Sequence, residues 1–204
     1  MPGSSLWLIP PPSHPLHQII SKLISEHLPS EFPDITGPPF APHMTLTSNI
    51  PPTVYGDKPQ EWLDSIPWPA SGDVQVQLKA VLTEDIFFRR CYIKVAFDGV
   101  RDVAGLARAR GVNDEESIGS KTEQWLDEWN SSFGPHVSLI YGDTPIEEAK
   151  LQKITDFVKS KKVSLERSDS NPQGGFGSWE GGVVWLVPTD KPIADWRPIA
   201  TKTL

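Results

Sequence analysis

Cysteine is nearly absent from the 204-residue sequence, and its scarcity excludes two classes of protein. With Cys91 alone, neither an intrachain disulfide framework nor a metal site built from several cysteines can form. Stability must therefore come from a packed core, and 38% hydrophobic residues in a chain of this length suffice for one domain. Cys91 itself is expected to be a small buried apolar side chain.

Long hydrophobic runs are also lacking. Residues 183–187 form the longest run late in the chain, far short of the ~18 residues of a transmembrane helix. Residues 6–9 are apolar but lead directly into three prolines, which makes this stretch too short for a secretory signal. We therefore expect an intracellular, cytoplasmic protein with no transmembrane segment. Peripheral association with an endomembrane such as the Golgi is compatible with this expectation.

Positive charge is scarce, because 19 Lys and Arg stand against 26 Asp and Glu, for a net charge of −7. Proteins that hold nucleic acid by counterion release need an excess of basic side chains, so we expect no stable nucleic-acid complex. A small anionic ligand in a local pocket remains compatible with this charge. The 21 prolines lie at the ends of apolar segments, where they act as rigid loop residues.

Strand and helix patterns are mixed along the chain, which predicts an α+β fold. Alternating or β-branched apolar residues predict strands over residues 6–9, 43–48, 74–80, 86–97, 136–141, 163–165 and 183–187. Apolar residues at helical spacing predict helices over residues 13–28, 62–66, 100–111, 121–129 and 144–160. Ser13 is the expected N-cap of the first helix. The last helix is expected to begin with Thr144 as N-cap, Pro145 as first residue and Glu147 as capping-box glutamate.

Two short segments, half a chain apart, are alike. They read Pro42-His43-Met44-Thr45-Leu46 and Pro135-His136-Val137-Ser138-Leu139, so both follow the pattern Pro-His-apolar-hydroxyl-Leu. A single His-x-Ser/Thr triplet is a weak signal, but two copies that share three further features are a much stronger one. Proline directly before each histidine is compatible with the start of a strand.

The spacing within each segment carries a chemical implication. Side chains at i and i+2 of a strand share a face, so His43 and Thr45 lie on one side, as do His136 and Ser138. If the two strands are neighbours, two imidazoles and two hydroxyls line one cleft. That set suits phosphodiester cleavage, with a neutral imidazole as general base on water and an imidazolium as general acid on the leaving oxygen. The hydroxyls can donate to the phosphoryl oxygens, and no metal ion or cofactor is required.

The doubled motif resembles the 2H phosphoesterase superfamily, and the segments 41–46 and 134–143 look most like its cyclic phosphodiesterase branch in fungi and plants. The resemblance covers most of the chain. It implies one bilobal domain over residues 1–204, a duplicated fold with two antiparallel sheets that face a central cleft and helices on the outside.

The function implied by the resemblance is metal-independent hydrolysis of small cyclic-phosphate nucleotides by a monomer. Nucleoside 2′,3′-cyclic phosphates would give 2′-phosphates. ADP-ribose 1″,2″-cyclic phosphate, a by-product of tRNA splicing, would give the 1″-phosphate. In the family pattern His136 is the base, His43 the acid, and Thr45 and Ser138 bind the phosphate. Tyr141 matches a phosphate or ribose contact, although strict alternation puts it on the face opposite His136 unless a bulge or strand end intervenes.

Two alternatives remain open from the sequence. A 2H enzyme acting on RNA or oligonucleotide ends would need a strip of basic residues leading from the cleft, and no such cluster is evident. A non-catalytic nucleotide-binding module would have no need for two histidines and two hydroxyls together.

Several other residues have two interpretations. Arg89 and Arg90 point to opposite faces of the predicted strand, so one could reach the cleft, although a surface position is commoner. Phe87 or Phe88 could stack on a base or pack in the core. The glycine-rich segment 174–182 is expected to be a plain loop, with a lid that uses Phe176 and Trp179 as the alternative. Expected to be structural are His14, His17 and His27 as helix residues and Asp143 as a turn residue.

Overall fold

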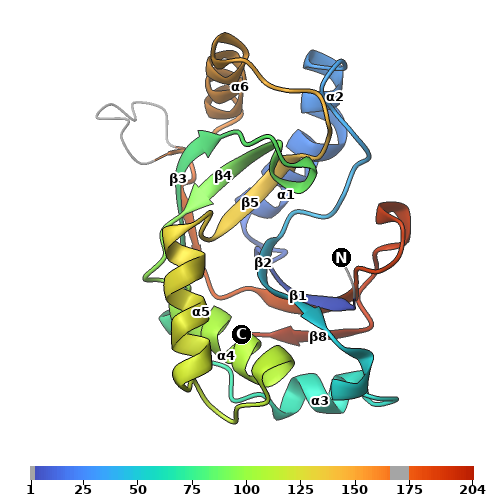
Figure 1. Ribbon diagram of the computed structural model, residues 1–204. Helices are drawn as coiled ribbons and strands as arrows, with labels where there is room; N and C mark the ends of the chain where they lie inside the picture. The colour runs from blue at the N-terminus through green and yellow to red at the C-terminus, as the bar shows by residue number, and fades with distance from the viewer. Residues whose placement is uncertain (1–2, 166–174) are drawn as a thin grey trace.

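The protein has an α+β fold built on antiparallel strands. Within residues 3–165 and 175–204, which this computed structural model describes, eight strands follow one another in the order β6-β3-β4-β5-β2-β1-β7-β8 (Figure 1). Their bounds are β1 Ser4–Ile9, β2 Met44–Ile50, β3 Gln75–Leu82, β4 Cys91–Val95, β5 His136–Ile140, β6 Ser178–Glu180, β7 Val183–Pro188 and β8 Ala200–Thr203.

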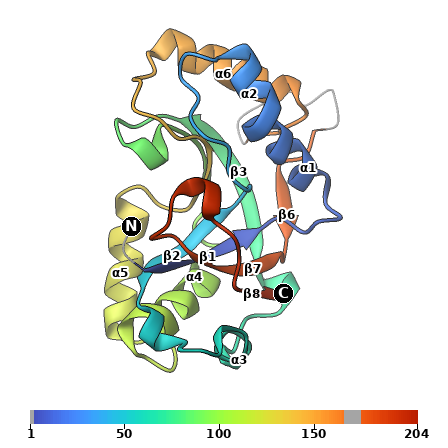
Figure 2. The same ribbon diagram turned by 90° about the vertical axis from the view of Figure 1, so that its right-hand side faces the viewer.

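The helices form two groups, one against each half of this strand series. They are α1 Pro15–Lys22, α2 Leu28–Glu31, α3 Pro59–Ser65, α4 Arg101–Arg108, α5 Ser120–Ser131 and α6 Glu148–Ser160, with π-helical turns η1 Leu23–His27 and η5 Ala109–Asn113. Short 3-10 turns are η2 Pro52–Val54, η3 Ser71–Asp73, η4 Phe87–Arg89 and η6 Ile193–Asp195. Contacts of η1 and α6 are to β5 and β3, whereas α3, α4 and η5 contact β8 and β2 (Figures 1 and 2). None of the helices in the described ranges is long and apolar enough to cross a membrane.

The two halves of the series meet at strands β2 and β5. Their antiparallel pairing consists of Met44 opposite Val137, and both side chains are fully buried. The strands therefore form one hydrogen-bonded series, not the two separate sheets expected from the resemblance. This junction brings together the two His-x-Ser/Thr segments.

Strand β1 is buried on both faces, which explains its short continuous apolar run. Leu6 and Leu8 belong to the main core, whereas Trp7 and Ile9 belong to a second cluster with Tyr141. In β3 the predicted alternation is confirmed as far as Leu78, because Val76 and Leu78 are buried. Beyond the register shift that follows Leu78 it changes phase, and Val81 is buried instead of Ala80. One face of β1 thus packs into the main core, and the other face packs in the same cluster as Tyr141.

Some boundaries predicted from the sequence were wrong. The strand expected over residues 86–97 begins only at Cys91, because the chain first turns through η4 to close the hairpin with β3. His14, not Ser13, is the N-cap of α1: Pro15 takes the first helical position, and His14 Nδ1 accepts a hydrogen bond from Leu16 N at 3.2 Å. His14 is therefore more than an ordinary helix residue.

Further along the chain, α6 has Glu147 as its N-cap instead of Thr144. The preceding Ile146 is 8% exposed and packs into the core, so the chain enters the helix later than the capping pattern suggested. Residues 163–165 do not form a strand. They contribute only one isolated bridge, between Val163 and Phe176.

Arg90 anchors the loop after β5, and it lies outside the strand and not at the surface position expected for it. Its side chain is buried; Nε donates to Gly142 O at 3.0 Å, Nη2 donates to Asp143 O at 3.1 Å, and the guanidinium pairs with exposed Asp85 at 2.8 Å. Asp143 takes part through its backbone, in agreement with its expected position in the turn after the strand.

We predict that Arg90→Met lowers the free energy of unfolding by about 2–4 kcal/mol, because two carbonyl oxygens lose their donors in a buried place. Asp85→Asn serves as the control and should cost less than about 1 kcal/mol, since its carboxylate is exposed. Urea unfolding of the three proteins measures both values. Equal stability of Arg90→Met and the unmodified protein would contradict this role.

Candidate active site

A cavity of about 390 Å³ lies where the two halves of the strand series meet. All five candidate residues predicted from the sequence line it, namely His43, Thr45, His136, Ser138 and Tyr141. Its volume is within the ordinary range for small-molecule sites. The folded chain thus brings together every candidate residue that the motif and the resemblance indicated.

His43 lies immediately before β2 and is only 4% exposed. Its Nδ1 is 2.7 Å from Ala41 O, and its ring stacks on Trp7 with centroids 3.8 Å apart. Nδ1 donates to the carbonyl, so the neutral ring presents an unprotonated Nε2. Burial, together with the charge of His136, lowers the pKa of His43 to about 4, against the opposing effect of the Ala41 carbonyl.

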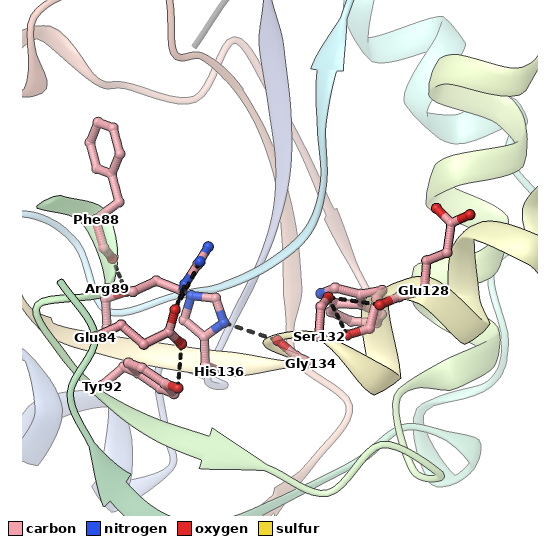
Figure 3. Close-up of polar contacts among 10 residues, drawn as sticks. Glu84, Phe88, Arg89, Tyr92, Glu128, Ser132, Gly134 and His136 are labelled. Carbon is pink, nitrogen blue, oxygen red and sulfur yellow. Dashed lines mark hydrogen bonds and ion pairs between the residues drawn. The ribbon is translucent and has the colours of Figure 1, made fainter. Parts of the chain in front are cut away.

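His136 is the first residue of β5 and repeats this arrangement. Its Nδ1 is 3.0 Å from Gly134 O (Figure 3), so Nε2 is again the nitrogen free for chemistry. The ring packs edge-on against Phe133. Burial lowers the pKa of His136 and the nearby Arg89 cation adds to this, whereas the Gly134 carbonyl and Glu84 act in the opposite direction.

The pairing of β2 and β5 relates the two motifs to each other. Met44 and Val137, which directly follow the two histidines, lie opposite each other and join the two strands. The histidine and the hydroxyl residue of both motifs line the cavity beside this junction.

The two hydroxyl residues differ in their surroundings. Thr45 is half-buried, and Ser138 is buried and donates from Oγ to Phe88 O at 3.0 Å. A serine hydroxyl has one proton, so Ser138 must rotate away from this carbonyl before it can donate to a bound group.

Tyr141 faces the cavity, in agreement with the resemblance and in contrast to strict strand alternation. Strand β5 ends at Ile140, so the alternation no longer applies at the next residue. The Tyr141 hydroxyl lies 3.4 Å from His43 Nε2, and its ring stacks on Phe40 with centroids 3.7 Å apart. Burial raises the pKa of the phenol, which therefore stays protonated, while a hydrogen bond with Ser138 has the opposite effect.

A network that the sequence did not reveal in full surrounds His136. Glu84 lies between Arg89 and Tyr92 beside the imidazole (Figure 3). Its Oε2 accepts from Arg89 Nε at 2.9 Å, and its Oε1 accepts from Tyr92 Oη at 2.7 Å. Burial alone would raise the pKa of Glu84, but these two hydrogen bonds hold it below its usual value. Arg89 also lies over the Phe133 ring, 4.2 Å from its centroid, and lines the cavity.

Arg89 is thus the arginine of the pair that reaches the cavity, and Arg90 is the structural one. Phe88 lines the cavity as well, whereas Phe87 packs against Phe88 and Tyr141. Cys91 is buried, as expected, and burial raises the pKa of its thiol to about 12.

The alternative in which segment 174–182 forms a lid is not supported by Phe176 and Trp179, the two aromatic residues proposed as its contacts. Trp179 is 2% exposed in the core, and Phe176 packs edge-on against His14 and does not line the cavity. The first residue of the predicted segment, Gly174, lies outside the described residues.

Trp7 is the main residue of the cavity whose role sequence reasoning missed. It pairs with Thr45 across β1 and β2, so the two side chains share a face. The sequence did contain a signal for Trp7. Side chains alternate along a strand, so Trp7 must face away from the core if Leu6 and Leu8 face into it. No comparable signal pointed to Phe40, which lies in a loop.

In the described part of the chain, no group of three or more His, Cys, Asp or Glu side chains is placed to hold a metal ion.

Comparison with known proteins agrees with this geometry. The family model described as cyclic phosphodiesterase-like protein matches residues 1–204. A 2′,3′-cyclic-nucleotide 3′-phosphodiesterase of Neurospora crassa is 54% identical over the full length of both chains. A protein of the same name from Phaeosphaeria nodorum is 39% identical, again over both full chains, and one from Yarrowia lipolytica is 26% identical over 98% of this chain and 99% of its own. The chain therefore belongs to the cyclic phosphodiesterase-like family of 2H phosphoesterases, which confirms the resemblance drawn from its two His-x-Ser/Thr motifs.

Proposed function

We propose that the protein hydrolyses nucleoside 2′,3′-cyclic phosphates to nucleoside 2′-phosphates. The observation that carries the proposal is the repeated placement of His43 and His136, each fixed through Nδ1 with Nε2 left free at one cavity. The names of the relatives in Neurospora crassa and Phaeosphaeria nodorum support the same reaction.

The reaction requires one base and one acid. A neutral imidazole takes a proton from water, and the water oxygen attacks phosphorus opposite the 3′ oxygen. The bond from phosphorus to the 3′ oxygen breaks, and the imidazolium of the other histidine protonates that oxygen. We assign the base to His136 and the acid to His43, as the resemblance implies.

The hydroxyls and the phenol complete the proposed site. Thr45 and Ser138 would donate to the two non-bridging oxygens, where negative charge grows in the transition state. Tyr141, held protonated by burial, would donate to the phosphate or the ribose. Arg89, which is paired with Glu84, lines the cavity next to His136 and would contact the anionic substrate there.

ADP-ribose 1″,2″-cyclic phosphate contains the same five-membered ring across two neighbouring ribose hydroxyls. We propose it as a second substrate, which would place the enzyme downstream of tRNA splicing.

We further propose that the enzyme is a cytoplasmic monomer that needs no metal ion. Finally, we propose that the chain is one domain with two duplicated lobes, each contributing one motif to a central cleft. The strand order supports this last point, because β5 and β2 each stand at the junction of their half.

Replacement of either histidine tests the proposed roles. We expect His43→Gln and His136→Gln each to lower kcat on 2′,3′-cyclic AMP by about 10²–10⁴-fold, since general acid–base catalysis contributes that much. His27→Gln, on η1, is the matched control and should retain full activity. Phosphorus NMR should show only the 2′-phosphate, at the same rate in excess EDTA. Activity that EDTA abolishes and a divalent ion restores would mean that a metal site had been mistaken for an acid–base pair.

The pH dependence of kcat/KM follows from the two lowered pKa values. One imidazole must be charged and the other neutral, and both pKa values are lowered in the free protein. The first proton taken up by the pair therefore increases activity as the pH falls below 6.5, the ordinary pKa of histidine, and the second abolishes it near about pH 4. Because the pKa near 4 belongs to His43, the reacting form, with His43 charged and His136 neutral, is the less populated of the two singly protonated forms. We expect a bell-shaped profile with its maximum on the acid side of neutrality. A flat profile between pH 4 and 8 would exclude the two-histidine mechanism.

A further inference from the structure

The cavity extends along β2 beyond the two motifs to a part that the proposed hydrolysis does not use. This distal part is lined by Thr47, Ser48, Asn49, Arg108 and Trp125. We call it the Arg108 subsite. It lies further along β2 than Thr45, beyond a register shift in the pairing of β2 with β1 between Thr45 and Thr47.

Arg108 lies at the end of α4, and within residues 3–165 and 175–204 no carboxylate forms an ion pair with it. Arg89 and Arg101, by comparison, are paired directly with Glu84 and Asp102. Burial lowers the pKa of the Arg108 guanidinium, and the charge of Glu128 is the smaller, opposing effect. A partly buried cation with no anion beside it is costly in a folded protein unless a ligand supplies the anion.

Two polar atoms of the subsite also lack partners. Among the residues that the structure describes, Arg108 Nε and Thr47 Oγ1 are buried and make no hydrogen bond. The great majority of buried polar atoms in proteins are hydrogen-bonded, so each such atom requires an explanation. Here both belong to side chains that line the same end of one cavity.

The orientation of Arg108 suits recognition of a phosphate. Its Cζ lies 5.0 Å from the centroid of the Trp125 ring, which in turn stacks on Trp129 at 5.1 Å and 14°. A guanidinium held over an aromatic ring keeps its N–H groups available around its edge, where they match phosphate oxygens in pairs. The edge of a neutral nucleobase would also accept hydrogen bonds from Arg108, but it would not compensate the positive charge of the guanidinium.

We propose that the Arg108 subsite binds a second phosphate, carried on the 5′ side of the ribose whose 2′,3′-cyclic phosphate lies at the histidines. Arg108 donates to its oxygens, and Thr47 Oγ1 contributes a further hydrogen bond. Both ends of such a substrate would lie in one cavity, because the histidines and Arg108 line the same space of about 390 Å³. This inference rests on the proposed function and narrows its substrate class to cyclic phosphates with a 5′-phosphate or 5′-diphosphate.

Three adenosine 2′,3′-cyclic phosphates that differ only at the 5′ position test the proposal: 5′-hydroxyl, 5′-monophosphate and 5′-diphosphate. We expect kcat/KM to be at least about 10-fold higher for one or both phosphorylated substrates than for the 5′-hydroxyl compound. Whichever of the two is preferred identifies the source of the second phosphate. In Arg108→Met this preference should fall to about onefold, whereas Arg108→Lys should retain part of it.

Arg110→Met is the matched control, because Arg110 follows on η5 but lines a different cavity. It should keep the preference of the unmodified protein. Equal rates of the unmodified protein on all three substrates would overturn the subsite, as would an equal loss by Arg108→Met on all three. If Arg108→Met does not fold, Thr47→Val replaces it, since it removes only the hydroxyl and should also lower the preference.

A binding measurement separates failure of this proposal from failure of the proposed function. Calorimetry with adenosine 5′-monophosphate and with adenosine needs no turnover. Tighter binding of the monophosphate that Arg108→Met removes would support the subsite even if no cyclic phosphate were hydrolysed. Equal binding of both compounds would overturn it even if hydrolysis were confirmed.

Discussion

A hydrogen bond from imidazole Nδ1 to the carbonyl two residues earlier is the interaction on which the whole site depends. It occurs twice, from His43 to Ala41 and from His136 to Gly134. In both places the intervening residue is proline, whose fixed φ restricts the direction in which the preceding carbonyl can point. The proline of each motif therefore helps to fix the orientation of the histidine ring. Without it, a buried neutral ring could rotate or change tautomer.

The second constraint is the junction between the two halves of the strand series. Met44 and Val137, the residues that follow the two histidines, pair at the centre, and the polar residues of both motifs line the same cavity. Apolar burial fixes this register, because a shift by one residue would turn Met44 and Val137 toward the cavity and the polar residues into the core. The same residues that fill the core thus determine which catalytic groups meet. Trp7 extends the arrangement by stacking on His43 from the neighbouring strand.

Sequence reasoning found those features that repeat or alternate. The doubled motif identified His43 and His136, and strand periodicity placed Thr45 and Ser138 beside them. It could not settle features that depend on where a strand stops, such as Tyr141, which reaches the cavity because β5 ends at Ile140. It also missed contacts between distant segments, including the stack of Phe40 on Tyr141. The expectation of two separate sheets failed because one pair of residues is enough to join them, and no local pattern encodes such a pair.

The most direct test of this account is the tautomer of the two histidines, measured by long-range ¹⁵N–¹H correlation NMR on the ligand-free protein near pH 7. His43→Gln and His136→Gln assign the two sets of signals. Both rings should be neutral, with the proton on Nδ1 and a free Nε2, because each Nδ1 donates to a backbone carbonyl. A ring that carries its proton on Nε2, or one that is charged at this pH, would contradict the account.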